Sequence, residues 1–579
     1  MASIEPADGV GVSGESSNQG ASGPVKSFWL RYGGWWVVVL VVVLGRLWGL
    51  ADYSLDWDEC NELAMAKLPV LDLIRVIYSR DIHPPAAHLL THVWVGLVGD
   101  TDLNVRLLYT VYGLLGLWGT YLLARLAKAP CRVSVYTLLL GVFCPFVWHY
   151  THLATHHAFF YATAVFSWVF FLRLLRQERL SVRSPDYWAY ALLSVLCLYA
   201  QSIAPFLLLS QAVFLVWRHP QQLRRHPQLW AGLAVGFALC DAPQLWAISQ
   251  PWHPSKMKEM GAGVHDAPSW GGLFFMPAQL LWMGDDKAFQ PLIPRWDRLL
   301  FYGGVGTFLL YYGFRSLKNK LPESIPLLIC ITGVPVLLLF AASLLLGLHV
   351  LHGRAILYVA FPVLLAMAVW IDAIETRQGK LSAWLLLFAI MAAQAWADFT
   401  FIELPANKQQ ADFRKIVQEI RPLQRPGDGF LISPGYMGLG IMRYLDPARF
   451  GLTPSEVQMD PRRTNLFHLV QRIEGPYFFV SGEDVRQRPD VQRAFRVFQQ
   501  THSRIWYMGD VKDYDTQLDC RNTFVVKGAD KRYWQVHCLS FGSQPCRAPL
   551  TGPDANQWQC NADLPAQPQA ATTVPVQAP

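Results

Sequence analysis

Long apolar runs fill the first two thirds of the chain and are absent from the last third. Runs of membrane length occupy residues 34–401, and none occurs after about residue 402. A transmembrane helix needs about 20 predominantly apolar residues. The pattern predicts a polytopic α-helical membrane protein of about 11 transmembrane helices, at residues 34–51, 105–125, 133–148, 156–175, 187–203, 204–217, 229–247, 298–314, 323–349, 355–374 and 382–401.

Lys and Arg concentrate in alternate loops between these runs. The basic loops hold Lys26 and Arg31; Arg125, Lys128 and Arg132; Arg173, Arg176, Arg179 and Arg183; Arg218, Arg224 and Arg225; Arg315, Lys318 and Lys320; Arg377 and Lys380. Because loops rich in Lys and Arg stay in the cytoplasm, we expect the N-terminus inside and, after an odd number of spans, the C-terminal part outside. This predicts a multi-pass protein of the plasma (inner) membrane with a periplasmic C-terminal domain.

The change in composition near residue 402 predicts the domain boundaries. A disordered cytoplasmic tail precedes the membrane domain, whose two long outer loops can carry chemistry, and an extracytoplasmic domain and a disordered tail follow. The predicted ranges are 1–30 for the first tail, 31–402 for the membrane domain with outer loops 52–104 and 248–297, 403–564 for the outer domain and 565–579 for the last tail.

The outer domain reads as a small α/β unit. Its first segment, 412–420, places apolar residues at helical spacing. Four short apolar runs predict strands at 429–433, 477–480, 504–508 and 523–526. Cys520, Cys538, Cys546 and Cys560 also lie here. With no Cys-x-x-Cys pair, disulfides are favoured over zinc, and all three pairings stay open.

Composition narrows the class of protein further. Hydrophobic residues make up 53% of the chain and charged residues 16%, with a mean hydropathy of +0.22, which excludes a disordered chain. The net charge of +7 sits mostly in the short basic loops, so it reports topology and does not indicate a nucleic-acid partner. The lipid bilayer is the partner that the sequence predicts.

The acids gather just outside the first span and are scarce inside the spans. Asp56, Asp58 and Glu59 follow the first apolar run, and Asp81 and His83 come next, before Pro84-Pro85. Transporters that move ions or protons usually carry acids at the membrane midplane, and this chain lacks that pattern. A carboxylate at the membrane surface can serve instead as a general base toward a hydroxyl. A solvated acidic loop without a catalytic role is the alternative.

The order of these motifs resembles the GT-C glycosyltransferase superfamily, in its branch of protein mannosyltransferase-like and aminoarabinose-transferase-like enzymes. The motifs are Asp58-Glu59, His83-Pro84-Pro85, Gly99-Asp100 before Arg106, Leu-Arg-Leu-Leu-Arg at the end of span 156–175, and His352-Gly353-Arg354. The resemblance implies an inverting transfer of a sugar from a polyprenyl-phosphate-linked donor to a hydroxyl acceptor on a glycan, lipid or protein, on the outer face of the membrane. A phosphoglycan or lipid-A-type transferase that uses a different donor on the same scaffold is the nearest alternative. A transporter or assembly factor for cell-envelope glycans is the non-enzymatic one.

The same resemblance assigns site residues. The base is an acid of the first outer loop, which gives Asp58, with Glu59 beside it and Asp56 as a weaker candidate. The leaving phosphate needs cationic donors. Arg354 fits that role, and Arg106 either shares it or only anchors its helix at the interface. Asp81 and His83 are further candidates for substrate binding, and His83 could equally orient its loop.

One segment departs from the family pattern. Where many relatives read Tyr-Ser-Gln-Glu-Ala-Arg, residues 150–157 read Tyr-Thr-His-Leu-Ala-Thr-His-His. We take His152, His156 and His157 as candidate substrate ligands, against the alternative of interface histidines bonded to the backbone. His152 and His156 are four apart, as two metal ligands on one helical face would be. No cofactor is certain, and a divalent metal stays an open alternative.

Overall fold

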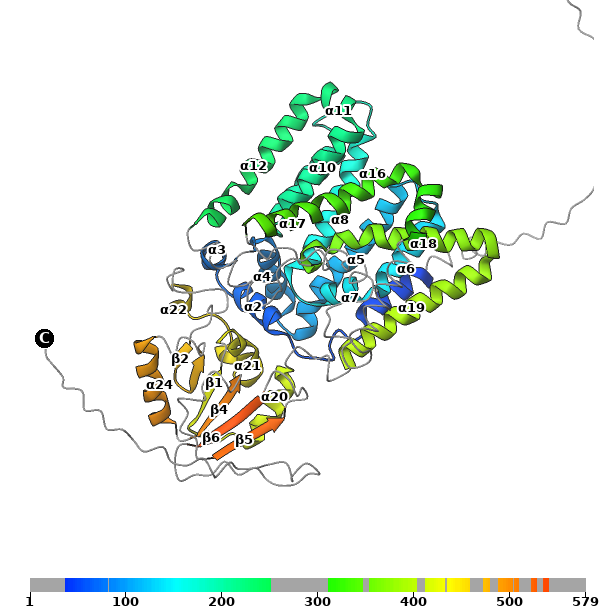
Figure 1. The fold of residues 1–579 in the computed structure, drawn as a ribbon. Coiled ribbons are helices and arrows are strands. Elements are labelled where there is room, and N and C mark those ends of the chain that lie inside the picture. The colour runs from blue at the N-terminus through cyan, green and yellow to red at the C-terminus, as the bar shows by residue number, and fades with distance from the viewer. Residues whose placement is uncertain are drawn as a thin grey trace, which may run out of the picture.

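The computed structural model describes two parts that lie side by side, a helical bundle and a mixed sheet with its own helices (Figure 1). The bundle ends at α19, and the sheet part begins at α20. The described residues are 37–81, 83–250, 311–346, 353–403, 412–432, 435–458, 472–479, 488–502, 504–509, 522–527 and 535–540. The predicted tails and the second outer loop, apart from residues 248–250, therefore lie outside the described residues.

Within the described residues, five helices are long and apolar enough to cross a membrane, or six if a bent pair counts as one span. The five are α5 (Asp102–Leu126), α8 (His156–Leu175), α12 (Pro227–Ser249), the run Pro322–Leu345 and the run Ile356–Gln378. Shorter apolar helices include Val37–Leu47, α10 (Ala204–Arg218) and Lys380–Trp396 within α19 (Lys380–Glu403). The chain is thus a helical membrane protein, while most of the predicted span 298–314 lies outside the described residues.

Several of these helices are segmented or joined by shorter ones. Pro322–Leu345 is built from η1 (Pro322–Ser324), α16 (Ile325–Leu328), η2 (Ile329–Gly333) and most of α17 (Val334–Leu346). Ile356–Gln378 joins most of η3 (Gly353–Val359) to α18 (Ala360–Gln378), and α9 (Pro185–Leu198) and α11 (Pro220–Arg225) flank α10.

The predicted single span at 133–148 is wrong in one respect, because the structure breaks it. Helix α6 (Cys131–Phe143) is followed by α7 (Pro145–His152), and the two are bent by 59°. Cys144 between them is extended, with φ −64° and ψ 113°. Pro145 explains the break, because proline has no amide hydrogen and disfavours helical geometry in the residue before it.

Helices α5 and α8 pack closely at the centre of the bundle. A Cβ atom added to Gly116 of α5 would lie 2.3 Å from the ring of Tyr161 on α8, and one added to Gly119 would lie 2.9 Å from Val165 Cγ1, also on α8. Glycine therefore permits the close approach of these helices. The Tyr161 hydroxyl also lies 2.8 Å from Thr120 Oγ1 of α5, which satisfies a polar group in the buried interface.

Residues 52–104, which the sequence predicts as the first outer loop, include three helices between the bundle and the sheet. These are α2 (Trp57–Ala66), α3 (Val70–Arg80) and α4 (Ala86–Val98). Helix α4 is apolar but too short to span a membrane, and it exposes Leu90, Val93 and Leu97. These three helices make up most of the loop, and α4 packs against α5.

The C-terminal part contains a six-stranded sheet in the order β2-β3-β1-β4-β6-β5. Strand β1 is parallel to β3 and β4, while β2, β6 and β5 run antiparallel to their neighbours. The strands are β1 (Asp428–Ile432), β2 (Arg472–Glu474), β3 (Tyr477–Phe479), β4 (Arg504–Gly509), β5 (Asn522–Lys527) and β6 (Gln535–Ser540). The four predicted strands correspond to β1, β3, β4 and β5, and the sequence missed β2 and β6.

Helices cover both faces of this sheet (Figure 1). On one face α24 (Pro489–Thr501) packs through Phe495 and Phe498 against Leu431 and Phe478. On the other, α20 (Phe413–Ile420) and α21 (Gly438–Leu445) pack against Phe430. Four short helices complete the connections: η4 (Arg421–Leu423), η5 (Gly435–Met437), η6 (Pro447–Arg449) and α22 (Pro454–Val457).

Candidate functional site

The acidic group after the first span forms the N-terminus of α2. Asp56 is the N-cap, and its Oδ1 accepts a hydrogen bond of 2.6 Å from the amide of Trp57. Glu59 returns the interaction, because its Oε2 accepts a bond of 2.7 Å from the amide of Asp56. Such a reciprocal arrangement fixes the start of a helix. Two of the three candidate acids are therefore part of the helix cap.

Asp58 differs from its two neighbours in exposure. Asp56 is 5% exposed and Glu59 is fully buried, whereas Asp58 is partly exposed on the first turn of α2. Burial, together with the negative charges of Asp58 and Glu59, raises the pKa of Asp56 well above its ordinary value. Of the three candidate acids, Asp58 presents the most accessible carboxylate.

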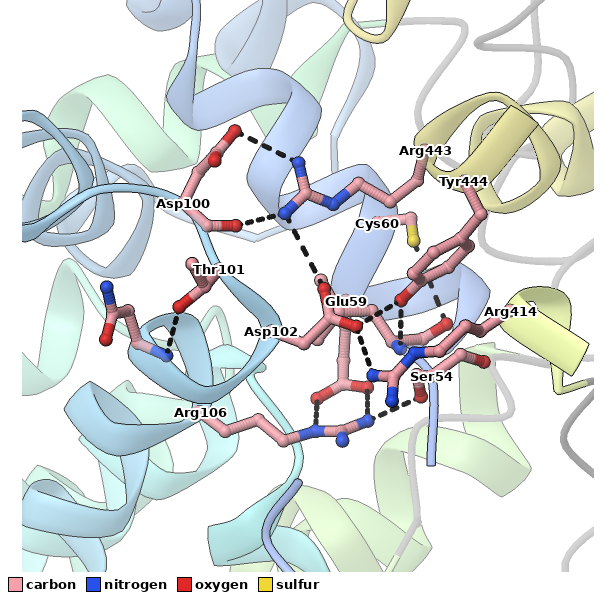
Figure 2. Close-up of polar contacts among 12 residues, drawn as sticks. Ser54, Glu59, Cys60, Asp100, Thr101, Asp102, Arg106, Arg414, Arg443 and Tyr444 are labelled. Carbon is pink, nitrogen blue, oxygen red and sulfur yellow. Dashed lines mark hydrogen bonds and ion pairs between the residues drawn. The ribbon is translucent and has the colours of Figure 1, made fainter. Parts of the chain in front are cut away.

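Glu59 is locked in a buried ion pair with Arg106 of α5 (Figure 2). Arg106 Nε donates to Oε1 at 2.9 Å and Nη2 donates to Oε2 at 2.7 Å, and both side chains are fully buried. The amide of Ala154 donates a further hydrogen bond of 2.8 Å to Glu59 Oε1. This carboxylate thus accepts four hydrogen bonds and joins the first loop to two other parts of the bundle.

The remaining donors of Arg106 hold the end of the first span. Its Nη1 donates to the carbonyls of Leu50 and Tyr53 at 3.2 and 2.8 Å, and Nη2 donates to that of Ser54 at 2.7 Å. The sequence left open whether Arg106 binds phosphate or serves as an anchor. The structure shows this guanidinium bonded to Glu59 and to three backbone carbonyls, and its part in phosphate binding stays a prediction.

The second acidic group is a buried network that the sequence found only in part. Asp81 Oδ1 accepts a bond of 2.9 Å from the amide of His83, and Asp81 Oδ2 lies 3.6 Å from His88 Nε2. His88 Nδ1 lies 2.8 Å from Glu62 Oε2. The Tyr109 hydroxyl donates to Glu62 Oε1 at 3.0 Å. Asp81 therefore belongs to a chain of buried polar groups that ends on α5.

Charges within this network set the pKa values of two of its members. Burial would raise the pKa of Asp81, but the charges of His88 and His83 and the hydrogen bond from the His83 amide lower it to about 2. Burial would lower the pKa of His88, but Glu62 and Asp81 raise it to about 10. We therefore take His88 as an imidazolium between two carboxylates at neutral pH. Glu62 could have been found by its three-residue spacing from Glu59 on the same helix.

Three of the predicted histidines come together, and the fourth lies apart. The ring centroids of His83 and His156 are 3.7 Å apart, and those of His156 and His157 are 4.1 Å apart. His83 follows α3, whereas the other two open α8. The structure thus brings His83 of the first loop together with His156 and His157, from the segment 150–157 that differs from the family pattern. We call these three residues the imidazole cluster.

The expectation that His152 and His156 share one helical face is wrong. His152 ends α7, His156 begins α8, and Leu153 between them is extended. His152 Nε2 donates a hydrogen bond of 2.6 Å to the carbonyl of Arg46, which is the backbone-bonded alternative. Within the described ranges, no group of three or more His, Cys, Asp or Glu side chains could hold a metal ion.

Two further predictions fall on positions whose side chains are not described. Arg354 is the second residue of η3, but its side chain lies outside the described residues. The same holds for Cys520, Cys538, Cys546 and Cys560, so their pairing stays a prediction.

Comparison with known proteins adds to this geometry. The family model described as dolichyl-phosphate-mannose-protein mannosyltransferase matches residues 82–246, from the first outer loop into α12. ArnT from Cupriavidus metallidurans in the apo state has a TM-score of 0.50 at 14% identity, covering 88% of this chain and 98% of that one. No curated protein matches the sequence.

Two further solved structures are similar at lower TM-scores. ArnT bound to undecaprenyl phosphate has a TM-score of 0.44 at 15% identity, covering 90% of this chain and 99% of that one. Archaeal oligosaccharyltransferase AglB from Archaeoglobus fulgidus, in complex with an inhibitory peptide and a dolichol-phosphate, has 0.48 at 10% identity, covering 83% and 70%.

The chain is a helical membrane protein with the fold of ArnT. The resemblance to the GT-C membrane glycosyltransferases that the motifs indicated is confirmed.

Proposed function

We propose that the protein is an inverting glycosyltransferase that moves a sugar from a polyprenyl-phosphate-linked donor to a hydroxyl acceptor. The matched family is named for a dolichyl-phosphate-mannose donor, and the fold is shared with ArnT. The observation that carries the proposal is the arrangement of the three acids at the N-terminus of α2. There a partly exposed Asp58 stands beside two acids that are buried and committed to the helix cap.

Asp58 acts as the general base in this proposal. Its carboxylate takes the proton of the acceptor hydroxyl while that oxygen forms a bond to the anomeric carbon of the sugar. The bond between that carbon and the phosphate oxygen breaks, and the polyprenyl phosphate leaves with the electron pair. Attack from the opposite face inverts the anomeric centre. A positioned general base typically contributes about 10²–10⁴-fold to the rate.

The leaving phosphate requires a cation, and we assign that role to Arg354. A guanidinium binds phosphate through two parallel charge-assisted hydrogen bonds. Arg106 is less suited, because Glu59 and three carbonyls engage its guanidinium inside the protein. The imidazole cluster of His83, His156 and His157 remains a candidate for substrate contact.

The predicted topology places this chemistry on the outer side of the plasma membrane. The N-terminus is then cytoplasmic, and both the first outer loop and the sheet domain are extracytoplasmic. The packing of α2 against the sheet domain supports this, because packed elements must lie on one side of the bilayer.

A strain that lacks the gene tests the proposal. The strain is complemented with the wild type, with Asp58→Asn, or with Glu323→Gln as a control of the same chemical kind at an exposed ion pair. Mass spectrometry of glycans and glycolipids should show a sugar modification that the wild type and the control restore and Asp58→Asn does not. If Asp58→Asn restores it fully with equal protein levels, Asp58 is not the base.

A further inference from the structure

Two acids at the start of α5 connect the bundle to the sheet domain (Figure 2). Asp100 Oδ2 accepts from Lys67 Nζ at 2.7 Å and from Arg443 Nη1 at 3.0 Å. Arg443 also donates through Nη2 to the backbone carbonyl of Asp100. Since Lys67 is the C-cap of α2 and Arg443 lies on α21, Asp100 ties the end of α2 to the outer domain.

Asp102 makes the corresponding connection at the beginning of α2. Its Oδ2 accepts from Arg414 Nη2 at 2.6 Å and from the Tyr444 hydroxyl at 2.6 Å. The Tyr444 oxygen in turn accepts a hydrogen bond of 2.7 Å from the amide of Leu55, the residue before the N-cap of α2. One hydroxyl of the outer domain therefore links Asp102 to the backbone that leads into α2.

Apolar packing supports these polar connections. Leu55, Cys60 and Leu63 belong to the same buried cluster as Phe413 and Met442 of the sheet domain. Burial of this kind excludes water from the interface and strengthens the hydrogen bonds beside it. Helix α2 is thus fixed to the outer domain along its length as well as at both ends.

We propose that Tyr444 is a positioning residue, through which the outer domain holds α2 and its carboxylate Asp58 in the geometry that catalysis requires. This inference rests on the proposed function. It assigns the outer domain a part in the reaction that needs no contact with either substrate.

The physical reason is the precision that proton transfer demands. A misplacement of about 1 Å at a reacting group can cost about 10²-fold in rate. Tyr444→Phe removes one hydroxyl and leaves both the Leu55 amide and Asp102 without one partner. The turn before α2 should then open more often, because a lost hydrogen bond to a buried group shifts such local equilibria by about tenfold.

The matched control is Tyr477→Phe. Its hydroxyl also donates to a carboxylate, Asp446 Oδ2 at 3.0 Å, but on the sheet side of the domain. Full-length protein in nanodiscs is examined by hydrogen exchange of residues 52–66 and by its affinity for undecaprenyl phosphate. Product formation is measured in the complemented strain. Asp102→Asn is a second variant of the same connection.

Tyr444→Phe and Asp102→Asn should each speed exchange at the Leu55 amide about tenfold. Product formation should fall by up to about 10²-fold, because Asp58 is then less precisely placed for proton transfer. Affinity for undecaprenyl phosphate should stay within about twofold, and Tyr477→Phe should change none of the three readouts. Unchanged exchange, unchanged product or lost lipid affinity in Tyr444→Phe overturns the positioning role.

Asp58→Asn separates this inference from the proposed function. If Asp58→Asn is inactive while Tyr444→Phe leaves exchange unchanged, only the positioning role fails. If Tyr444→Phe speeds exchange while Asp58→Asn stays active, the proposed base fails and its positioning with it.

Discussion

Glu59→Gln should destabilise the protein strongly although it changes a single atom. The glutamine has the size and shape of the glutamate, but it carries no charge and replaces one acceptor oxygen with a donor NH₂. Glu59 accepts hydrogen bonds from two nitrogens of Arg106 and from the amides of Asp56 and Ala154. The new NH₂ group must therefore face at least one donor, and the Arg106 charge stays buried without a counter-ion.

The expected magnitude follows from the burial of both partners. Both side chains are 0% exposed, and removing one member of a buried ion pair costs about 3–5 kcal/mol. Asp58→Asn should cost at most about 1 kcal/mol, the value of an acid in the first turn of a helix. The first change thus acts on stability, and the second acts on the reaction.

Thermal unfolding of the protein in nanodiscs measures this difference. Glu59→Gln should lower Tm clearly, while Asp58→Asn and the exposed-pair control Glu323→Gln should stay close to the wild type. The double variant Glu59→Gln with Arg106→Gln should lose less than the sum of the two single changes, because the second removes the uncompensated charge. If Glu59→Gln keeps the wild-type Tm but abolishes product, Glu59 belongs to the chemistry and the buried-pair reasoning is wrong.

Three other regions of the molecule give predictions. The pKa of His88 is raised from 6.5 to about 10, so its charge stabilises the fold fully below pH 6.5 and is lost as pH rises toward 10. Wild-type Tm should fall over that interval, and His88→Gln should flatten the fall. Gly116→Ala should cost about 1–3 kcal/mol by overpacking, and Gly236→Ala, with no atom within 4 Å of its added Cβ, should not; equal Tm values would contradict this. Reporter fusions after Arg183 and Thr400 should report opposite sides of the membrane, and the same side would refute the predicted topology.

The membrane helices could be predicted from sequence because length and apolar composition are enough to define them. Helices α5, α8 and α12 fall where the apolar runs predict them. The break between α6 and α7 could have been predicted from Pro145, because proline disfavours helical geometry in the residue before it. Strand β6 was missed, since the polar pattern Gln-Val-His-Cys-Leu-Ser lacks the apolar run that marked the others.

The candidate site was predictable in composition and only partly in arrangement. The sequence placed Asp58 and Glu59 together, but the exposure that separates their roles depends on Arg106, 47 residues away from Glu59. His88 was missed because its partners, Glu62 and Asp81, are acids from two other helical segments. Long-range pairing of this kind leaves no periodic signal along the chain.

Release of polyprenyl phosphate from a sugar-linked carrier tests the central claim most directly. Wild-type protein, Asp58→Asn and Glu323→Gln in nanodiscs are incubated with the polyprenyl lipid extract and the envelope fraction of the strain that lacks the gene. Mass spectrometry follows the freed lipid phosphate. The wild type and Glu323→Gln should release it at the same rate, and Asp58→Asn should be slower by about 10²–10⁴-fold at unchanged Tm. Release by Asp58→Asn at the wild-type rate would contradict the assignment of Asp58 as the base of a glycosyl transfer.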